Sequence, residues 1–200
     1  KFLILPCGVD LVDFTPENTV GIKEKYDLPE TYVICPGALT KSKGPQNVVD
    51  AASEYSEHAL TVFIGAGELK EELEEKLGNK GKFLGFVSSE DKAKLINAAT
   101  LLVAAPEKKE HFGIIYAEAL AGGTPCVAYD GGGVGSIVTP TEGILTLRDP
   151  KKLGEKINHL LQNSGLRRQM AVSCRARAEK YYNYNELVQE LLDWLKPMIK

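Results

Sequence analysis

The amino-acid sequence predicts a doubly wound α/β domain, in which helices cover both faces of a parallel sheet. Short apolar runs of strand length alternate with segments of helical periodicity along the chain. The strand-like runs are apolar on both faces, which is typical of parallel strands buried between two layers of helices. The loops that follow these runs are rich in glycine, as expected where a ligand meets the carboxyl edge of such a sheet.

The elements follow one another in a regular order. We expect strands at residues 31–35, 59–64, 82–84, 101–105, 125–129 and 143–147. We expect helices at residues 45–55, 69–77, 89–99 and 113–121, and three more at 151–163, 166–182 and 186–195. Ser88 or Ser89 is the expected N-cap of the helix at 89–99.

The chain has 200 residues, of which 44% are hydrophobic and 26% are charged, enough for one well-buried core. We divide it into a linker with a first strand at residues 1–17, a ligand-binding domain at 18–182 and a C-terminal helix at 183–200. The chain opens on the apolar run KFLILPCGVD without an initiator methionine. We therefore expect a fragment of a longer protein.

Composition argues against several classes of function. A net charge of −3 gives no general attraction for nucleic acid. The four cysteines are widely spaced and have no histidine cluster near them, so neither a disulfide framework nor a metal site is expected, and a cytoplasmic location fits best. No run approaches the about 18 apolar residues of a transmembrane helix. Peripheral contact with a membrane is left open.

The loop PEKKEHFG and the helix after it carry the clearest site chemistry. Gly113 at the helix entry lets a ligand approach the backbone, where free amides suit a phosphate; a simple tight turn is the alternative. Glu118 lies inside the helix among small apolar residues, so it either faces a pocket, where it can bind the hydroxyls of a ribose, or pairs with an arginine or faces solvent. Glu110 stands in a charge run that is ordinarily solvated, but its position allows contact with a sugar or an oxocarbenium-like charge.

Two lysines precede the helix start at Gly44 and Pro45. Lys41 and Lys43 can neutralise a diphosphate there, although most exposed lysines are simply solvated. The loop GAGE has no third glycine at the spacing of a dinucleotide fingerprint, because Lys70 stands in that place. It is weak evidence for NAD.

Glu110 and Glu118, separated by seven residues, are followed by Phe112-Gly113 and by the run ALAGGTP respectively. This signature resembles the retaining, nucleotide-sugar-dependent group 1 glycosyltransferases of the two-domain B-type fold, which include glycogen synthase and many mannosyltransferases. The motifs PCGVDLVDFTPE, FIGAGE, FLGFVSSED and GGGVGSIV agree with that family in order and spacing. The resemblance covers the C-terminal, donor-binding half of such enzymes, a Rossmann-like domain.

The resemblance implies a donor site for a nucleotide-diphosphate sugar linked to UDP, GDP or ADP, with no metal or other cofactor. Glu118 then binds the ribose, Lys43 the diphosphate and Glu110 the donor sugar near the reacting carbon. The remaining expected contacts are Phe112, Gly113, Ile114 and Ile115 at the distal phosphate or sugar, and Phe86 and Val87 at the base. The acceptor site belongs to a missing N-terminal domain, so the fragment alone is expected to be inactive, and any membrane contact is expected through that domain.

Two positions depart from the family's pattern. Gly37-Ala38 stands where the family usually has Gly-Arg, so either Lys41 compensates for the lost cation or donor affinity is weak; Cys7 replaces the usual linker asparagine. The missing arginine motivates a second hypothesis, a non-catalytic descendant or regulatory domain that keeps the fold. Another two-domain nucleotide-sugar enzyme, such as an epimerase, is a third alternative. The last helices, with Tyr181, Tyr182, Tyr184 and Trp194, resemble the segment that in such enzymes crosses back toward the other domain. An ordinary amphipathic helix that packs on its own core is the alternative.

Overall fold

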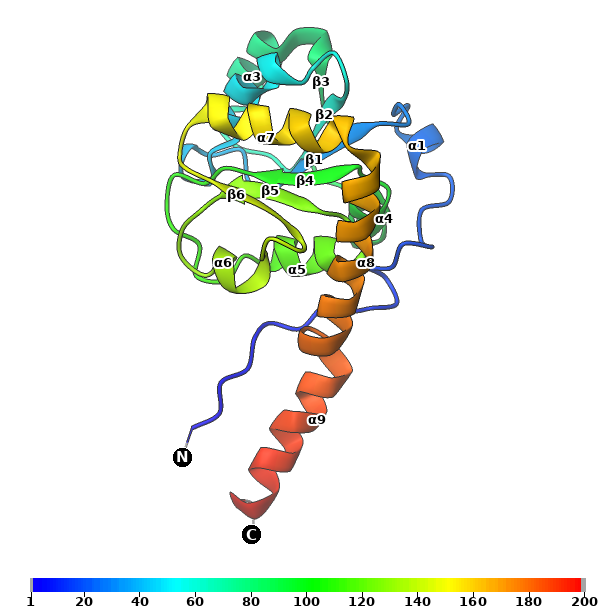
Figure 1. The fold of residues 1–200 in the computed structure, drawn as a ribbon, viewed down its shortest axis with the longest axis vertical. Helices are drawn as coiled ribbons and strands as arrows, with labels where there is room; N and C mark the ends of the chain where they lie inside the picture. Colours follow the sequence, from blue (N-terminus) through cyan, green and yellow to red (C-terminus); the bar gives the residue numbers. More distant parts are fainter. Residues whose placement is uncertain (1, 199–200) are drawn as a thin grey trace.

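Six parallel strands form one sheet in the computed structural model, which describes residues 2–198 (Figure 1). Their order is β3-β2-β1-β4-β5-β6, so the direction of winding reverses between β1 and β4. The strands are β1 (Tyr32–Pro36), β2 (Leu60–Ile64), β3 (Gly81–Phe83), β4 (Leu101–Ala104), β5 (Cys126–Tyr129) and β6 (Gly143–Thr146). The predicted doubly wound α/β class is confirmed.

Helices cover both faces of the sheet, and the last of them projects from the domain. They are α1 (Ile22–Lys25), α2 (Pro45–Ala51), α3 (Lys70–Leu77), α4 (Ser89–Asn97), α5 (Ile114–Ala121), α6 (Val134–Ile137), α7 (Pro150–Gln162), α8 (Ser164–Tyr181) and α9 (Tyr184–Leu195). Helices α3 and α7 lie above the sheet in Figure 1, and α5 and α6 lie below it. Alternate strand residues serve the two cores: Val33 and Cys35 pack with α2, α3 and α7, whereas Ile34 packs with α4, α5 and α8.

Local signals place several helix ends. Ser88 Oγ accepts a hydrogen bond of 3.0 Å from the backbone amide of Asp91, so Ser88 is the N-cap of α4, one of the two predicted candidates. Asp149 caps α7 in the same way, through the amide of Lys152 at 3.1 Å, and this helix begins at Pro150. The helices α1 and α6 were not predicted, because four residues are too few to show a helical period.

The N-terminal segment corrects one prediction. Residues 2–17 contain no named strand, and Lys1 lies outside the described residues. Val9 instead forms an isolated bridge to Asn183: its amide donates to the carbonyl of Tyr182 at 2.7 Å, and its carbonyl accepts from the amide of Tyr184 at 3.1 Å. The apolar run has no neighbouring strand within residues 2–198, so its backbone pairs only at this point.

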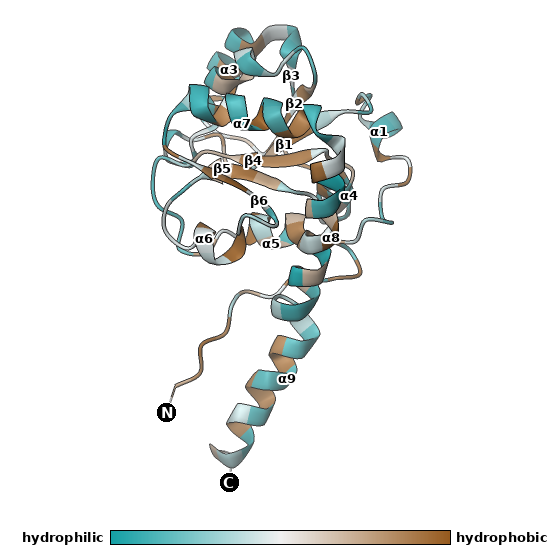
Figure 2. Ribbon diagram, in the orientation of Figure 1, coloured by the Kyte–Doolittle hydropathy of each residue, from teal (hydrophilic) through white to brown (hydrophobic). Residues whose placement is uncertain are grey.

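The C-terminal helix α9 projects from the domain beside the N-terminal segment (Figure 1). None of its residues is buried, although apolar and polar residues alternate along it (Figure 2). The alternative that this helix packs on the core of its own domain is therefore wrong. Ile199 and Lys200, the end of the predicted segment 183–200, lie outside the described residues.

Candidate functional site

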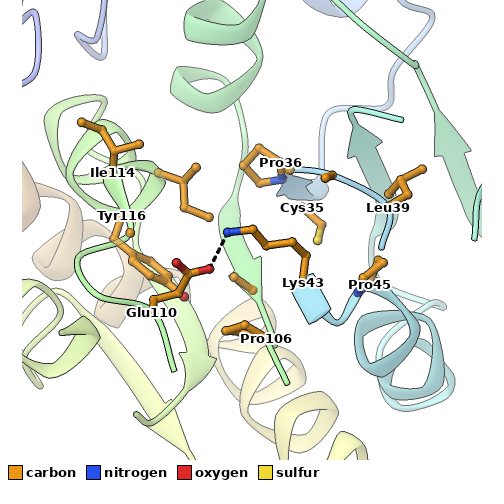
Figure 3. A pocket seen from close by; sticks show the side chains of 14 residues that line it. Cys35, Pro36, Leu39, Lys43, Pro45, Pro106, Glu110, Ile114 and Tyr116 are labelled. Carbon is orange, nitrogen blue, oxygen red and sulfur yellow. Dashed lines mark hydrogen bonds and ion pairs between the residues drawn. The ribbon is translucent and has the colours of Figure 1, made fainter. Parts of the chain in front are cut away.

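A cavity of about 210 Å³ lies where the winding of the sheet reverses, between the loops that follow β1 and β4 and the start of α5 (Figure 3). Its walls come from segments far apart in the sequence. They are Cys35, Pro36, Gly37, Ala38, Leu39, Lys43, Pro45, Ala104, Pro106, Glu110, Gly113, Ile114, Ile115 and Tyr116. This is the position at which doubly wound sheets bind their ligands.

The N-terminus of α5 opens into this cavity. Gly113 is its N-cap at φ +86°, a left-handed conformation, and a Cβ there would lie 2.6 Å from Cε2 of Tyr116, so the position requires glycine. Gly113 offers no side-chain cap to the first turn, and no acidic residue lies in that turn. The backbone amides near Ile114 and Ile115 therefore keep their partial positive charge for a ligand, which favours an anion.

An ion pair crosses the cavity. Lys43 Nζ lies 2.7 Å from Oε1 of Glu110, with the two side chains 49% and 25% exposed (Figure 3). Lys43 comes from the 3₁₀ turn Lys41–Lys43 after β1, and Glu110 from the loop after β4. The two loops meet because Gly44, at φ +70°, carries no side chain: a Cβ there would stand 1.9 Å from the carbonyl oxygen of Ala105.

A glycine-rich loop holds Glu110 from the other side. The amide of Gly133 donates to the carbonyl of Glu110 at 2.8 Å, and Gly132 forms an isolated bridge with the same residue. Gly132 has φ +69°, and a Cβ on it would lie 2.0 Å from the Glu110 carbonyl oxygen. The motif GGGVGSIV contains this loop, and its three consecutive glycines are the sequence signal of such a close backbone approach.

A second cavity, of about 330 Å³, adjoins the first through Pro36, Gly37 and Ala38, which line both. The rest of its lining is Ile64, Gly65, Ala66, Gly85, Phe86, Val87, Ser89 and Lys92. Phe86 is 88% exposed and offers a free aromatic ring at this wall. A mostly apolar wall with backbone polar groups suits a flat heterocyclic base.

Glu118 lies behind this second cavity and lines neither of the two. Its residue is only 8% exposed, and Lys92 Nζ lies 2.7 Å from Oε1 and 2.6 Å from Oε2. Glu118 is therefore paired with a cation, as in the alternative interpretation, but the cation is a lysine and not an arginine. Lys92 was not among the predicted site residues, because it stands in a charged helical segment where most lysines are solvated.

Besides Glu118, two other predicted site residues line neither cavity. Lys41 is exposed, and it lines neither cavity in the described chain, so its ammonium is not placed to replace the missing arginine. The Phe112 ring turns away and packs edge-on against Tyr182, with ring centroids 5.9 Å apart, because an apolar ring is stabilised by burial against this helix end. The first cavity thus gathers Lys43, Glu110, Gly113, Ile114 and Ile115, and the second gathers Phe86 and Val87.

Cys35 lines the first cavity and carries a thiol, a side chain that can act as a nucleophile. Burial raises the pKa of its thiol to about 12, so the thiolate is scarce at neutral pH. With 8% exposure, Cys35 packs as a small buried hydrophobe.

The fold and these cavities define a ligand-binding domain of the doubly wound class, with an anion site beside an apolar pocket. Residues 21–179 match the sequence profile described as "Glycosyl transferases group 1", and the chain belongs to this family. It is 28% identical to an uncharacterized glycosyltransferase of Methanocaldococcus jannaschii, over 90% of this chain and 47% of the relative. It is 27% identical to a GDP-mannose-dependent phosphatidylinositol monomannoside mannosyltransferase of Corynebacterium glutamicum, over 96% of this chain and 55% of the relative.

Solved structures agree on the fold. The Anabaena protein HepE in complex with UDP and glucose superimposes with a TM-score of 0.85 at 22% identity, over 95% of this chain and 55% of that one. The C-terminal domain of a group 1 family protein of Francisella tularensis superimposes with a TM-score of 0.77 at 27% identity, over 88% of this chain and 100% of that one. The chain thus spans about half the length of the curated relatives it matches.

Within residues 2–198, no helix is long and apolar enough to cross a membrane. No group of three or more His, Cys, Asp or Glu side chains there is arranged to hold a metal ion.

Proposed function

We propose that the chain is the donor-binding half of a retaining hexosyltransferase that takes a sugar from a nucleotide-diphosphate donor. One observation carries the proposal: the two cavities join at Pro36, Gly37 and Ala38, with the helix terminus and Lys43 in one and the exposed Phe86 ring in the other. An extended ligand with an anionic centre and a flat base fits that sequence of surfaces. An epimerase is not favoured, because the family match is to glycosyl transferases.

The donor lies across both cavities in this proposal. The base contacts Phe86 and Val87, the ribose faces the side where Glu118 is held, and the diphosphate meets Lys43 and the amides near Gly113. Two similar proteins support the ligand class: HepE was crystallised with UDP and glucose, and the Corynebacterium relative is named as GDP-mannose-dependent. The nucleotide of this chain's donor remains one of UDP, GDP or ADP.

The chemistry that these groups supply is mainly electrostatic. As the bond from the sugar to the diphosphate breaks, negative charge grows on the leaving phosphate oxygen, where the α5 amides and Lys43 stabilise it. Glu110, at the edge of the same cavity, is placed to stabilise the oxocarbenium-like charge on the sugar. No metal or other cofactor is invoked. The acceptor hydroxyl and retention of configuration belong to the whole protein. We propose that its acceptor domain is the missing partner of this chain and that α9 is the segment that reaches this domain.

Binding of nucleotides by the 200-residue chain tests the proposal. Calorimetry with UDP, GDP and ADP should detect at least one of them, and Glu118→Gln should weaken it about tenfold by removing a charged acceptor. Glu90→Gln, on the exposed side of α4, is the matched control and should leave affinity unchanged. A folded chain that binds none of the three contradicts the proposal. The Francisella C-terminal domain was crystallised by itself, which supports work on the isolated half.

A non-catalytic domain is the second candidate, and Ala38 is the observation that favours it. Ala38 lines both cavities, and it brings no charge to the place where the family usually has an arginine. Sugar transfer by the longer protein, abolished by Glu110→Gln, would exclude this candidate. Transfer that survives Glu110→Gln would remove Glu110 from the mechanism instead.

For the whole protein we propose action in the cytoplasm, with any membrane contact made through the acceptor domain. The Corynebacterium relative supports this, because its name gives a phosphatidylinositol monomannoside as the acceptor, which is a lipid. Co-sedimentation of the longer protein with phosphatidylinositol vesicles, compared with the 200-residue chain, tests where the contact lies. Binding by the 200-residue chain alone contradicts the assignment to the acceptor domain.

A further inference from the structure

Lys92 of α4 and Glu118 of α5 form an ion pair beside the second cavity. Lys92 Nζ lies within 2.7 Å of both carboxylate oxygens, and the two side chains are 31% and 10% exposed. Lys92 donates a hydrogen bond to Oε1, whereas the buried Oε2 has no hydrogen-bond partner among the described residues. The ammonium thus fixes the position of the carboxylate and leaves Oε2 able to accept another hydrogen bond.

Lys92 also reaches a different environment from Glu118. It lines the second cavity, and it is the one charged side chain among the lining residues there within the described part of the chain. An ammonium group has three N–H donors. The carboxylate takes at most two of them, so at least one remains for a ligand in the cavity.

Together the two side chains present opposite hydrogen-bonding characters side by side. The carboxylate can only accept, and the ammonium can only donate. The two neighbouring hydroxyls of a ribose each donate and accept, so they fit a pair of this kind better than they fit either charge alone. Phe86 and Val87 in the same cavity leave the base on the far side of the ribose.

We propose that Lys92 and Glu118 act as one unit that recognises the vicinal diol of the donor's ribose. The carboxylate accepts from one hydroxyl, and the ammonium donates to the oxygen of the other while it keeps the carboxylate in place. Lys92 is thus a ribose-recognition residue in addition to the signature glutamates. The inference rests on the proposed function, because it requires that the second cavity hold a nucleoside.

The experiment separates the ribose from the rest of the ligand. Calorimetry on the 200-residue chain first finds the tightest of UDP, GDP and ADP, and then compares it with its 2′,3′-dideoxy counterpart. Loss of both hydroxyls should weaken binding to the unmodified protein about tenfold or more. In Lys92→Met the ribonucleotide should lose about tenfold in affinity and the dideoxynucleotide less than about twofold, so the preference for ribose nearly disappears.

Two further variants keep this comparison interpretable. Lys92→Arg keeps a cation beside Glu118 and should restore most of the ribose preference even if Lys92→Met is unstable. Lys94→Met removes a lysine two positions away on the same helix, whose partner Glu90 is exposed, and should leave both affinities unchanged.

Each outcome decides the inference. Equal losses for both nucleotides in Lys92→Met mean that the lysine only supports the fold, and tighter ribonucleotide binding means that it only blocks the carboxylate; either result overturns the proposal. Binding of neither nucleotide by the unmodified, folded chain overturns the proposed function and this inference with it. Loss of the ribose preference in Lys92→Met with its return in Lys92→Arg supports the inference.

Discussion

Lys43 and Glu110 form an ion pair of 2.7 Å across the cleft, although 67 residues separate them in the chain. The loops after β1 and β4 bring them together, because these strands are neighbours in the sheet. The pair neutralises the lysine until a ligand arrives. A diphosphate carries more negative charge than one carboxylate, so it can compete for the same ammonium.

Lys43→Met should therefore weaken binding of a nucleoside diphosphate about tenfold, because it removes a partly exposed cation from the phosphate site. Binding of the free nucleoside should stay the same, and calorimetry with the tightest-binding of UDP, GDP and ADP and with its nucleoside makes the comparison. Lys70→Met is the control, since Lys70 pairs with Glu74 on α3 and lines neither cavity. An equal loss for the nucleoside would show that Lys43 acts on the fold and not on the phosphates.

Gly132→Ala should displace the loop that carries Glu110. The new Cβ would stand 2.0 Å from the Glu110 carbonyl, at a φ of +69°, so we expect a loss of about 2 kcal/mol or more in the free energy of unfolding. Urea denaturation measures it. Gly135→Ala, whose Cβ would meet nothing closer than 3.8 Å, should change stability by less than about 0.5 kcal/mol. Equal effects of the two substitutions would contradict this account of the loop.

Asp91 gives the protein a specific loss of stability in acid. Hydrogen bonds from Lys25 at 2.6 Å and Tyr26 at 2.8 Å hold the pKa of its carboxyl below the ordinary value of 3.8. A lowered pKa contributes stability that is fully present above the unfolded value and is lost as the pH falls through the folded one. Asp91→Asn should thus be less stable than the unmodified protein at pH 7, by a difference that narrows below about pH 4.

Urea denaturation between pH 7 and pH 2.5 measures that difference. Lys25→Met removes the main cause of the lowered pKa. Its own difference in stability from the unmodified protein should therefore also narrow over this pH range. A gap that stays constant down to pH 2.5 would mean that folding leaves the pKa of this carboxyl unchanged, against its two hydrogen bonds.

The four cysteines should differ sharply in reactivity. Cys7 is exposed, whereas Cys35, Cys126 and Cys174 are buried, and burial raises the pKa of each of these three thiols. Iodoacetamide at pH 8 should modify Cys7 alone in the native chain and all four after denaturation, as intact-mass spectrometry will show. Cys35 is only 8% exposed, so its modification in the native chain would mean that the first cavity opens more widely in solution.

The sequence was sufficient for the fold class and for most element positions, because these depend on local periodicity. Its expected helix at residues 113–121 corresponds to α5 (Ile114–Ala121), and its strand at 59–64 to β2 (Leu60–Ile64). It failed where pairing depends on a partner. The run at the N-terminus reads like a strand but has no neighbouring strand in residues 2–198, and only Val9 pairs.

The site divides in the same way. The sequence motifs predicted Gly113, Lys43 and Glu110, because a helix start and the loop after a strand are local features of the sequence. The turning of Phe112 toward Tyr182, the exposure of Lys41 and the hold of Lys92 on Glu118 depend on side chains that meet only after the sheet has formed. Local sequence therefore determined which loops carry the site, and tertiary packing decided which side chains face the ligand, because burial and charge pairing act between residues that are distant in the chain.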